Sequence, residues 1–263
     1  MIYITGDCHR NFERFDIENF PEQKEMTKDD YVIICGDFGF WTPSKEREDT
    51  LNELDRRPFT TLFVDGNHED FDELNSFPVT MWHGGKVHQV RNCVIHLMRG
   101  QVFRIAEKTF FTFGGAASHD IQGGIFEVKD ADKCLKKLNV SRKDIVTGDL
   151  AAYDEACMKL MPYRINHVSW WKEEISSEAE RNEAFCNLEA HNWKVDFAVT
   201  HDGPQSIISM YSLGKIRPDE TRIFLQEMQE KLDYRYWFFG HHHDNKNVTV
   251  KDIMLYEQII QID

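Results

Sequence analysis

Five short runs of apolar residues, none of which alternates with polar residues, constrain the fold of this 263-residue chain most. They occupy residues 2–4, 31–35, 61–64, 197–199 and 236–239. Runs of this kind predict strands that are buried on both faces, as in the sheets of α/β proteins. A glycine or polar residue follows each run and marks the carboxyl end of the strand, where open α/β sheets bind their ligands. We therefore expect one site at the strand ends, built from residues that are far apart in the sequence.

Seven potential metal ligands lie in five clusters at the ends of these runs, and no single cluster could hold a metal ion. In chain order they are Asp7, His9, Asp37, Asn67, His201, His241 and His243. Together they supply the carboxylate, imidazole and amide-oxygen groups that two divalent ions need if they share a bridging carboxylate. A pair of such ions activates water for attack on phosphorus. The set therefore predicts a two-metal centre.

The spacing within two of the clusters supports this prediction. In residues 7–9 (Asp-Cys-His) and in residues 241–243 (His-His-His), the two candidate ligands are separated by one residue. Side chains two positions apart in an extended segment lie on the same face, so both members of each pair can reach one site. The residues between them, Cys8 and His242, then point away, and we expect them to be packing residues.

The composition limits the partners of this chain. It has 31 basic and 45 acidic residues, which gives a net charge of -14. That charge disfavours long duplex nucleic acid, which needs a broad basic face, but permits a small phosphorylated substrate because two metal ions bring positive charge of their own. The six cysteines show no CxxC spacing, and no apolar run approaches transmembrane length. These features predict a cytoplasmic protein with reduced thiols and no membrane contact.

Further elements are expected between the strand-like runs. Helices are predicted over residues 43–57, 176–192 and 218–232, where Ser177 and Glu180 fit a capping box and Pro218 would lie in a first turn. Shorter alternating segments predict antiparallel strands. These cover residues 87–90, 93–97, 102–105, 109–113, 248–250 and 254–262.

The candidate ligands extend over nearly the whole chain, which indicates a single domain of residues 1–263. Residues from about 117 to 168 interrupt this organisation, and the ligand clusters resume beyond them. We expect this segment to be a cap or insertion, with helix-like pieces at residues 130–138 and 149–161.

In this order, the clusters D-x-H, G-D, G-N-H-E, a single histidine and G-H-x-H resemble the calcineurin-like metallophosphoesterase superfamily, over nearly the whole chain. The resemblance implies an α/β (α+β) fold, in which two mixed β-sheets flanked by helices form a four-layer sandwich with the metals at the strand ends. It also implies two ligand sets that share Asp37. Asp7, His9 and His243 would complete the first set, and Asn67, His201 and His241 the second.

The implied function is hydrolysis of a phosphoester by in-line attack of a metal-bridged hydroxide. Asp37 and Asn67 would hold the metals, and His68, which follows Asn67, would be the general acid. A phosphodiester or small nucleotide is the favoured substrate, and a short single strand is a further candidate. The alternatives are a phosphomonoesterase resembling protein phosphatases and a non-catalytic metal-binding scaffold. Mn²⁺ is the preferred ion, although Fe, Zn, Ni or Co would also suit nitrogen and oxygen ligands.

Two departures from the protein-phosphatase pattern bear on the substrate. Phe40 replaces the aspartate that orients the catalytic histidine, so either Glu69 or Asp70 takes that role or the histidine acts without such a partner. The arginines that clamp a phosphomonoester are replaced by residues 38–41, which are mostly aromatic, and by Asp65. The second departure favours an aromatic-walled pocket for a small organic phosphoester over protein phosphatase activity. Candidate substrate contacts are Arg10, Phe40, His119, Arg164 and Trp170.

Overall fold

The computed structural model describes residues 1–121, 124–127, 162 and 164–262, and it divides into two compact units. The first unit comprises Met1–Ala117 with Glu173–Asp263, and the second is Ser118–Lys172. Among the described residues, no helix has the length and apolar character that crossing a membrane requires. The helix-like pieces expected at residues 130–138 and 149–161 lie outside the described residues.

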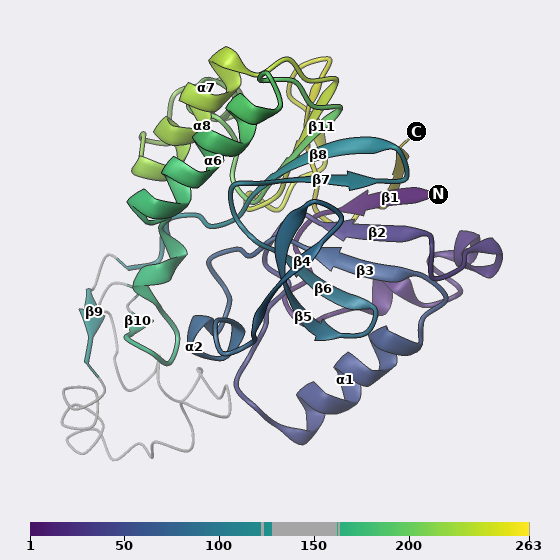
Figure 1. Cartoon of the computed structure of the whole chain (residues 1–263). Coiled ribbons are helices and arrows are strands. Elements are labelled where there is room, and N and C mark those ends of the chain that lie inside the picture. Colours follow the sequence, from purple (N-terminus) through teal and green to yellow (C-terminus); the bar gives the residue numbers. More distant parts are fainter. Residues whose placement is uncertain (122–123, 128–161, 163, 263) are drawn as a thin grey trace. The chain divides into compact units, whose positions relative to one another are not determined.

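The first unit contains a seven-stranded sheet in the order β15-β1-β2-β3-β6-β5-β4 (Figure 1). Strands β1, β2, β3 and β6 are parallel, and antiparallel strands complete both edges. The strands are β1 (Ile2–Thr5), β2 (Tyr31–Ile34), β3 (Thr60–Phe63), β4 (Val79–Trp82), β5 (Gly85–Arg91), β6 (Val94–Leu97) and β15 (Ile260–Ile262). Because β1, β2 and β3 pair in parallel from end to end, the loops that follow them emerge at the same edge of the sheet.

A six-stranded sheet in the order β13-β14-β12-β11-β8-β7 forms the second half of this unit. Here β8, β11, β12 and β14 are parallel, while β7 and β13 are antiparallel edge strands. The strands are β7 (Gln101–Ile105), β8 (Lys108–Phe113), β11 (Phe197–Thr200), β12 (Tyr236–Phe239), β13 (Lys246–Asn247) and β14 (Asp252–Met254). Both sheets are thus mixed, as expected from the sequence.

Three apolar layers hold the sheets and helices together. Between the sheets, Ile33 and Leu62 of the first belong to the same buried cluster as Phe197 and Phe238 of the second. Another cluster joins the outer face of the first sheet to α1 (Lys45–Arg56). A third joins the outer face of the second sheet to α6 (Glu178–Ala190), α7 (Gln205–Ser212) and α8 (Glu220–Lys231). Figure 1 shows these three helices together, with α1 on the opposite side. The predicted sandwich of two mixed sheets with flanking helices is confirmed.

The helix ends follow local capping. Ser44 caps α1 by accepting a hydrogen bond from the backbone N–H of Arg47, and the predicted capping box of Ser177 and Glu180 begins α6. The prediction for the third helix is wrong at its start. Asp219, not a residue before Pro218, is the N-cap of α8, so the proline lies outside the helix. Two short helices were not predicted: α2 (Phe71–Leu74) and α7.

Four strand predictions need correction. Residues 248–250 form a bend rather than a strand. The single strand expected over residues 254–262 is two strands that belong to different sheets, since β14 ends at Met254 and β15 begins at Ile260. Strands β6 and β8 also pair in parallel, with β3 and β11 respectively, besides their antiparallel neighbours. In the second unit, β9 (Ile125–Phe126) and β10 (Arg164–Ile165) form a short parallel pair.

Candidate metal centre

The loops that carry the candidate ligands have an unusual backbone conformation. His9, Asp37, His241 and His243 all have positive φ angles, between 44° and 67°. This left-handed region costs free energy for residues other than glycine, and such residues persist where the surrounding structure holds them. Four of the seven predicted ligands therefore lie on backbone that is held in a strained form.

Asp7, His9, Asp37 and His243 form one group, with one potential ligand atom from each lying within 4.8 Å of all the others. His9 Nε2 is 2.9 Å from His243 Nε2 and 3.5 Å from Asp37 Oδ2, and His243 Nε2 is 3.2 Å from Asp7 Oδ2. Ligand bonds of roughly 2.0–2.2 Å place neighbouring ligand atoms about 3 to 3.5 Å apart. The carboxylates are buried, while the imidazoles of His9 and His243 are 30% and 47% exposed. The group therefore fits one metal ion, with the buried carboxylates on one side of it and the partly exposed imidazoles on the other.

The remaining candidate ligands gather on the other side of Asp37. His201 Nε2 lies 3.2 Å from Asn67 Oδ1 and 3.4 Å from Asp37 Oδ1, and the ring centres of His201 and His241 are 5.0 Å apart. Nδ1 of His201 lies 2.9 Å from the backbone oxygen of Cys35, to which it donates, so Nε2 faces the ligand group. Asp37 therefore directs Oδ1 toward this group and Oδ2 toward the first, which is the arrangement of a bridging carboxylate.

Glycines next to the ligands leave room for them. A Cβ atom on Gly36 would overlap with the imidazole of His201, and one on Gly240 would overlap with the carboxylate of Asp7. The φ of Gly36 is also positive, at 87°, which favours glycine for a second reason. The loop glycines are thus part of how the sequence brings these ligands together.

Replacement of Gly240 by alanine is expected to weaken Mn²⁺ binding by about 10- to 100-fold, because the added methyl group displaces the Asp7 carboxylate. Titration calorimetry with Mn²⁺ measures the effect. Gly214→Ala is the control, since among the described residues nothing lies within 4 Å of a Cβ at that position. Unchanged Mn²⁺ affinity in Gly240→Ala would contradict the placement of Asp7 at the metal.

The charges within the site depend on one another. Burial acts to raise the pKa of Asp37, but the neighbouring His201 imidazole has the larger effect and holds that pKa well below its ordinary value. Burial likewise lowers the pKa of His201, yet the Asp37 carboxylate more than offsets this and raises it to about 10. Burial dominates at His9 and His241 and lowers the pKa of both. Without metal, His201 is therefore protonated at neutral pH.

Because a metal ion must displace that proton, Mn²⁺ affinity is expected to rise by about tenfold per pH unit between about pH 6.5 and 8.5. The pKa of Asp37 is held well below its ordinary value, so binding releases the proton of His201, and the raised pKa of His243, caused by its hydrogen bond to Asp7, adds to the proton count. Titration calorimetry in two buffers of different ionisation enthalpy counts the released protons. A count near zero at neutral pH would contradict the assignment of His201 as a ligand.

His68, the predicted general acid, lies next to the site. Its backbone N–H donates to Asp37 Oδ1 at 2.8 Å, and its ring centre is 5.0 Å from that of His9. The two acidic residues considered as its orienting partners have other contacts. Glu69 accepts backbone N–H groups of the two ligand loops, and Asp70 caps α2 through the N–H of Glu73. These carboxylates therefore stabilise the backbone of the loops around His68 through hydrogen bonds.

A buried carboxylate that sequence reasoning missed lies behind the second ligand group. Asp202 Oδ1 is 3.1 Å from His242 Nε2, and Oδ2 is 2.7 Å from Nε of Arg222 in α8. It therefore ties the loop of His201 to the loop of His241 and to a helix. An acidic residue directly after a candidate ligand was the only sequence signal for it.

Asp65 is also buried and contacts an arginine and a histidine. Its carboxylate accepts from Nε of Arg99 at 2.8 Å and lies 3.1 Å from Nε2 of His96. His96 in turn contacts His88, with 3.1 Å between their Nδ1 atoms. The position where protein phosphatases carry a phosphate-clamping arginine is thus occupied by a structural carboxylate.

The predicted substrate contacts differ in burial and in the unit to which they belong. The Arg10 guanidinium lies 5.3 Å from the ring centre of Trp41, close to the ligand His9 in sequence. Phe40 is 1% exposed and belongs to the core behind the first sheet, which argues against direct contact with a substrate. His119, Arg164 and Trp170 lie in the second unit, where Arg164 pairs with Asp120. Their role as substrate contacts stays a prediction.

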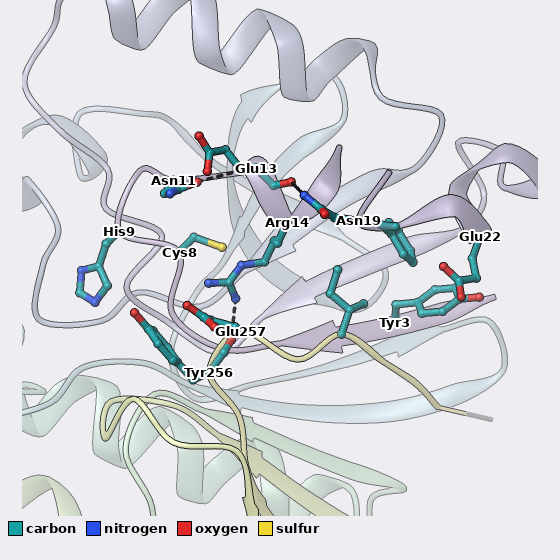
Figure 2. Close-up of a pocket in the computed structure, with 12 residues that line it drawn as sticks. Tyr3, Cys8, His9, Asn11, Glu13, Arg14, Asn19, Glu22, Tyr256 and Glu257 are labelled. Carbon is teal, nitrogen blue, oxygen red and sulfur yellow. Dashed lines mark hydrogen bonds between the residues drawn. The ribbon is translucent and has the colours of Figure 1, made fainter. Parts of the chain in front are cut away.

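A cavity of about 500 Å³ lies beside the first ligand group (Figure 2). Its lining includes His9 and Tyr256, one arginine, and the carboxylates of Glu13, Glu22 and Glu257. Cys8, in its floor, is buried, and burial raises the pKa of its thiol to about 12, so it remains a neutral packing group. The cavity is large enough for a small organic group next to a metal-bound phosphate.

Comparison with known proteins agrees with this geometry. Residues 1–245 match the family model of the calcineurin-like phosphoesterases. A segment of 142 residues is 28% identical to lariat debranching enzyme A of Xenopus laevis. The segment covers 48% of this chain and 26% of the Xenopus protein. The match thus spans about a quarter of the length of this relative. The family supports metal-dependent hydrolysis of phosphoesters, as the motifs predicted. Because the family match covers nearly the entire sequence, the chain belongs to the calcineurin-like phosphoesterase family.

Proposed function

We propose that this protein is a phosphodiesterase that acts on a small phosphodiester with two bound divalent ions, most effectively Mn²⁺. The observation that carries the proposal is the orientation of Asp37, whose two carboxylate oxygens face two separate groups of ligands. A scaffold would not need one carboxylate that faces two sets of potential ligands, and the sequence retains every residue of the motifs.

Two divalent ions, when bound, polarise the phosphoryl group and lower the pKa of water. Asp7, His9, Asp37 and His243 would hold one of them, and the second would be held by Asp37, Asn67, His201 and His241. His68 would donate a proton to the oxygen of the leaving group, which is placed near the ring by the bound phosphate. Its backbone contact with Asp37 fixes the distance between this acid and the bridging carboxylate.

The acidic surroundings favour a diester over a monoester. At neutral pH a diester carries one negative charge and a monoester close to two, and the carboxylates that line the cavity repel the second charge more. The net charge of -14 acts in the same direction. In addition, the arginine that would compensate a monoester is replaced by Asp65, which is itself paired with Arg99.

A branched nucleic acid is a second candidate substrate, which the name of the Xenopus laevis relative supports. The shared segment covers only about a quarter of that protein. The strong net negative charge of this chain favours a short oligonucleotide over a long one.

Hydrolysis of bis(4-nitrophenyl) phosphate and of 4-nitrophenyl phosphate, each with Mn²⁺ and after chelation, tests the proposal. We expect the diester to be hydrolysed with the higher kcat/KM, and chelation to stop turnover of both. A higher kcat/KM for the monoester would favour the phosphatase alternative. Turnover of neither ester, nor of a short 2′,5′-branched oligonucleotide, by protein that holds two ions per chain would favour the scaffold.

A further inference from the structure

Arg14 lies between the loop that carries the ligands Asp7 and His9 and the loop that carries Tyr256. Its guanidinium donates to Thr5 Oγ1 at 2.8 Å and to the backbone oxygens of Gly6, Asp7 and Tyr256 at 3.3, 2.6 and 2.5 Å. All four acceptors are uncharged, and among the described residues this half-buried arginine has no carboxylate partner in an ion pair. Figure 2 shows its side chain reaching toward Tyr256.

Tyr256 connects this arginine to the ligand His243. The rings of Tyr256 and His243 stack with their centres 4.6 Å apart and an angle of 13° between their planes. The Arg14 guanidinium lies 5.9 Å from the same tyrosine ring. The backbone of Tyr256 is fixed at both ends, since its oxygen accepts from Gly6 N and its N–H donates to Asn245 Oδ1.

We infer that Arg14 and Tyr256 are positioning residues that set the affinity of the first metal position, an inference that rests on the proposed two-metal function. Arg14 holds the backbone of Asp7, and Tyr256 stacks on the ring of His243, which is 47% exposed. Neither residue is itself a ligand. Both act by keeping two ligands of one ion in place before that ion binds.

The second metal position is held by different contacts. His201 is fixed by the backbone oxygen of Cys35, and the loops behind it are joined through Asp202. Loss of the contacts made by Arg14 or Tyr256 should therefore weaken one position and spare the other. Residues that orient metal ligands typically contribute about 10- to 100-fold to metal affinity.

The chemistry of Arg14 and Tyr256 determines which replacements keep the ligands of the first metal ion in position. Arginine presents five N–H donors in a rigid planar fork, so lysine at position 14 cannot reach the oxygens of Asp7 and Tyr256 together. Phenylalanine at position 256 keeps the stacked ring and the backbone contacts, whereas leucine removes the stack.

The test is a titration of metal-free protein with Mn²⁺ by calorimetry, together with thermal unfolding in chelator. In Arg14→Lys and Tyr256→Leu we expect one of the two Mn²⁺ affinities to fall by about 10- to 100-fold, while the other stays at the wild-type value. Tyr256→Phe should bind both ions as the wild type does. Arg181→Lys is the matched control, because Arg181 also donates to a backbone oxygen, that of Ser176, and lies in α6 on the outer face of the second sheet.

Equal weakening of both positions, unchanged affinities in Arg14→Lys and Tyr256→Leu, or the same loss in Tyr256→Phe as in Tyr256→Leu would each overturn the inference. If Arg14→Lys does not fold, the comparison of Tyr256→Leu with Tyr256→Phe tests the inference. Calorimetry and thermal unfolding measure metal binding and stability without requiring the protein to hydrolyse a substrate. Wild-type protein that binds two ions without hydrolysing either ester would therefore overturn the proposed function alone.

Discussion

The Asp37→Asn variant is expected to lose about 10³-fold or more in kcat/KM, because it removes the charge that both metal positions share. Two bound ions stabilise the transition state by several kcal/mol, and each 1.4 kcal/mol lost lowers the rate about tenfold. The variant should also bind less than two ions per chain. Turnover of bis(4-nitrophenyl) phosphate and metal analysis of the same sample measure both effects.

Asp49→Asn is the matched control for Asp37→Asn, because it makes the same chemical change on the exposed face of α1. It should retain wild-type turnover and metal content. If Asp37→Asn also retained two ions and wild-type turnover, Asp37 would not be the bridging residue. Circular dichroism separates loss of metal from loss of fold.

The His68→Gln variant is expected to lose about 10²- to 10⁴-fold in kcat while keeping two ions per chain. His68 adjoins the site through its backbone contact with Asp37, which glutamine can also make, so the ligands should stay in place. Proton donation matters most when the leaving group is basic. The loss should therefore be larger for a diester that releases phenol than for one that releases 4-nitrophenol.

The control for His68→Gln is His191→Gln, since His191 is exposed at the end of α6. We expect it to leave turnover unchanged. Equal losses for the phenol and 4-nitrophenol substrates would show that His68 contributes by some route other than proton donation. Loss of an ion in His68→Gln would move the residue into the metal-binding group.

Much of this architecture could be predicted from the sequence, because buried parallel strands leave a strong signal. The unalternating runs at residues 31–35 and 61–64 correspond to β2 and β3, whose parallel register places Asp37 and Asn67 at one edge. The capping box at Ser177 was likewise predictable, since it depends on residues three positions apart.

The contacts that support the site could not be predicted, because they join segments distant in the sequence. Tyr256 stacks on His243 from a loop between strands of different sheets, and an alternating pattern does not specify to which sheet a strand belongs. Arg14 and Asp202 had no distinctive spacing. Phe40 was expected near the substrate from its place in the motif, but its buried ring completes the core of the first sheet.

The central claim is that side chains from five loops form one centre for two metal ions. Metal analysis of the purified protein, reconstituted with excess Mn²⁺ and then freed of unbound ions, tests it most directly. Our account predicts two tightly held Mn²⁺ ions per chain, and a reduced number in Asp37→Asn. Fewer than one ion per chain in the wild-type protein would contradict it.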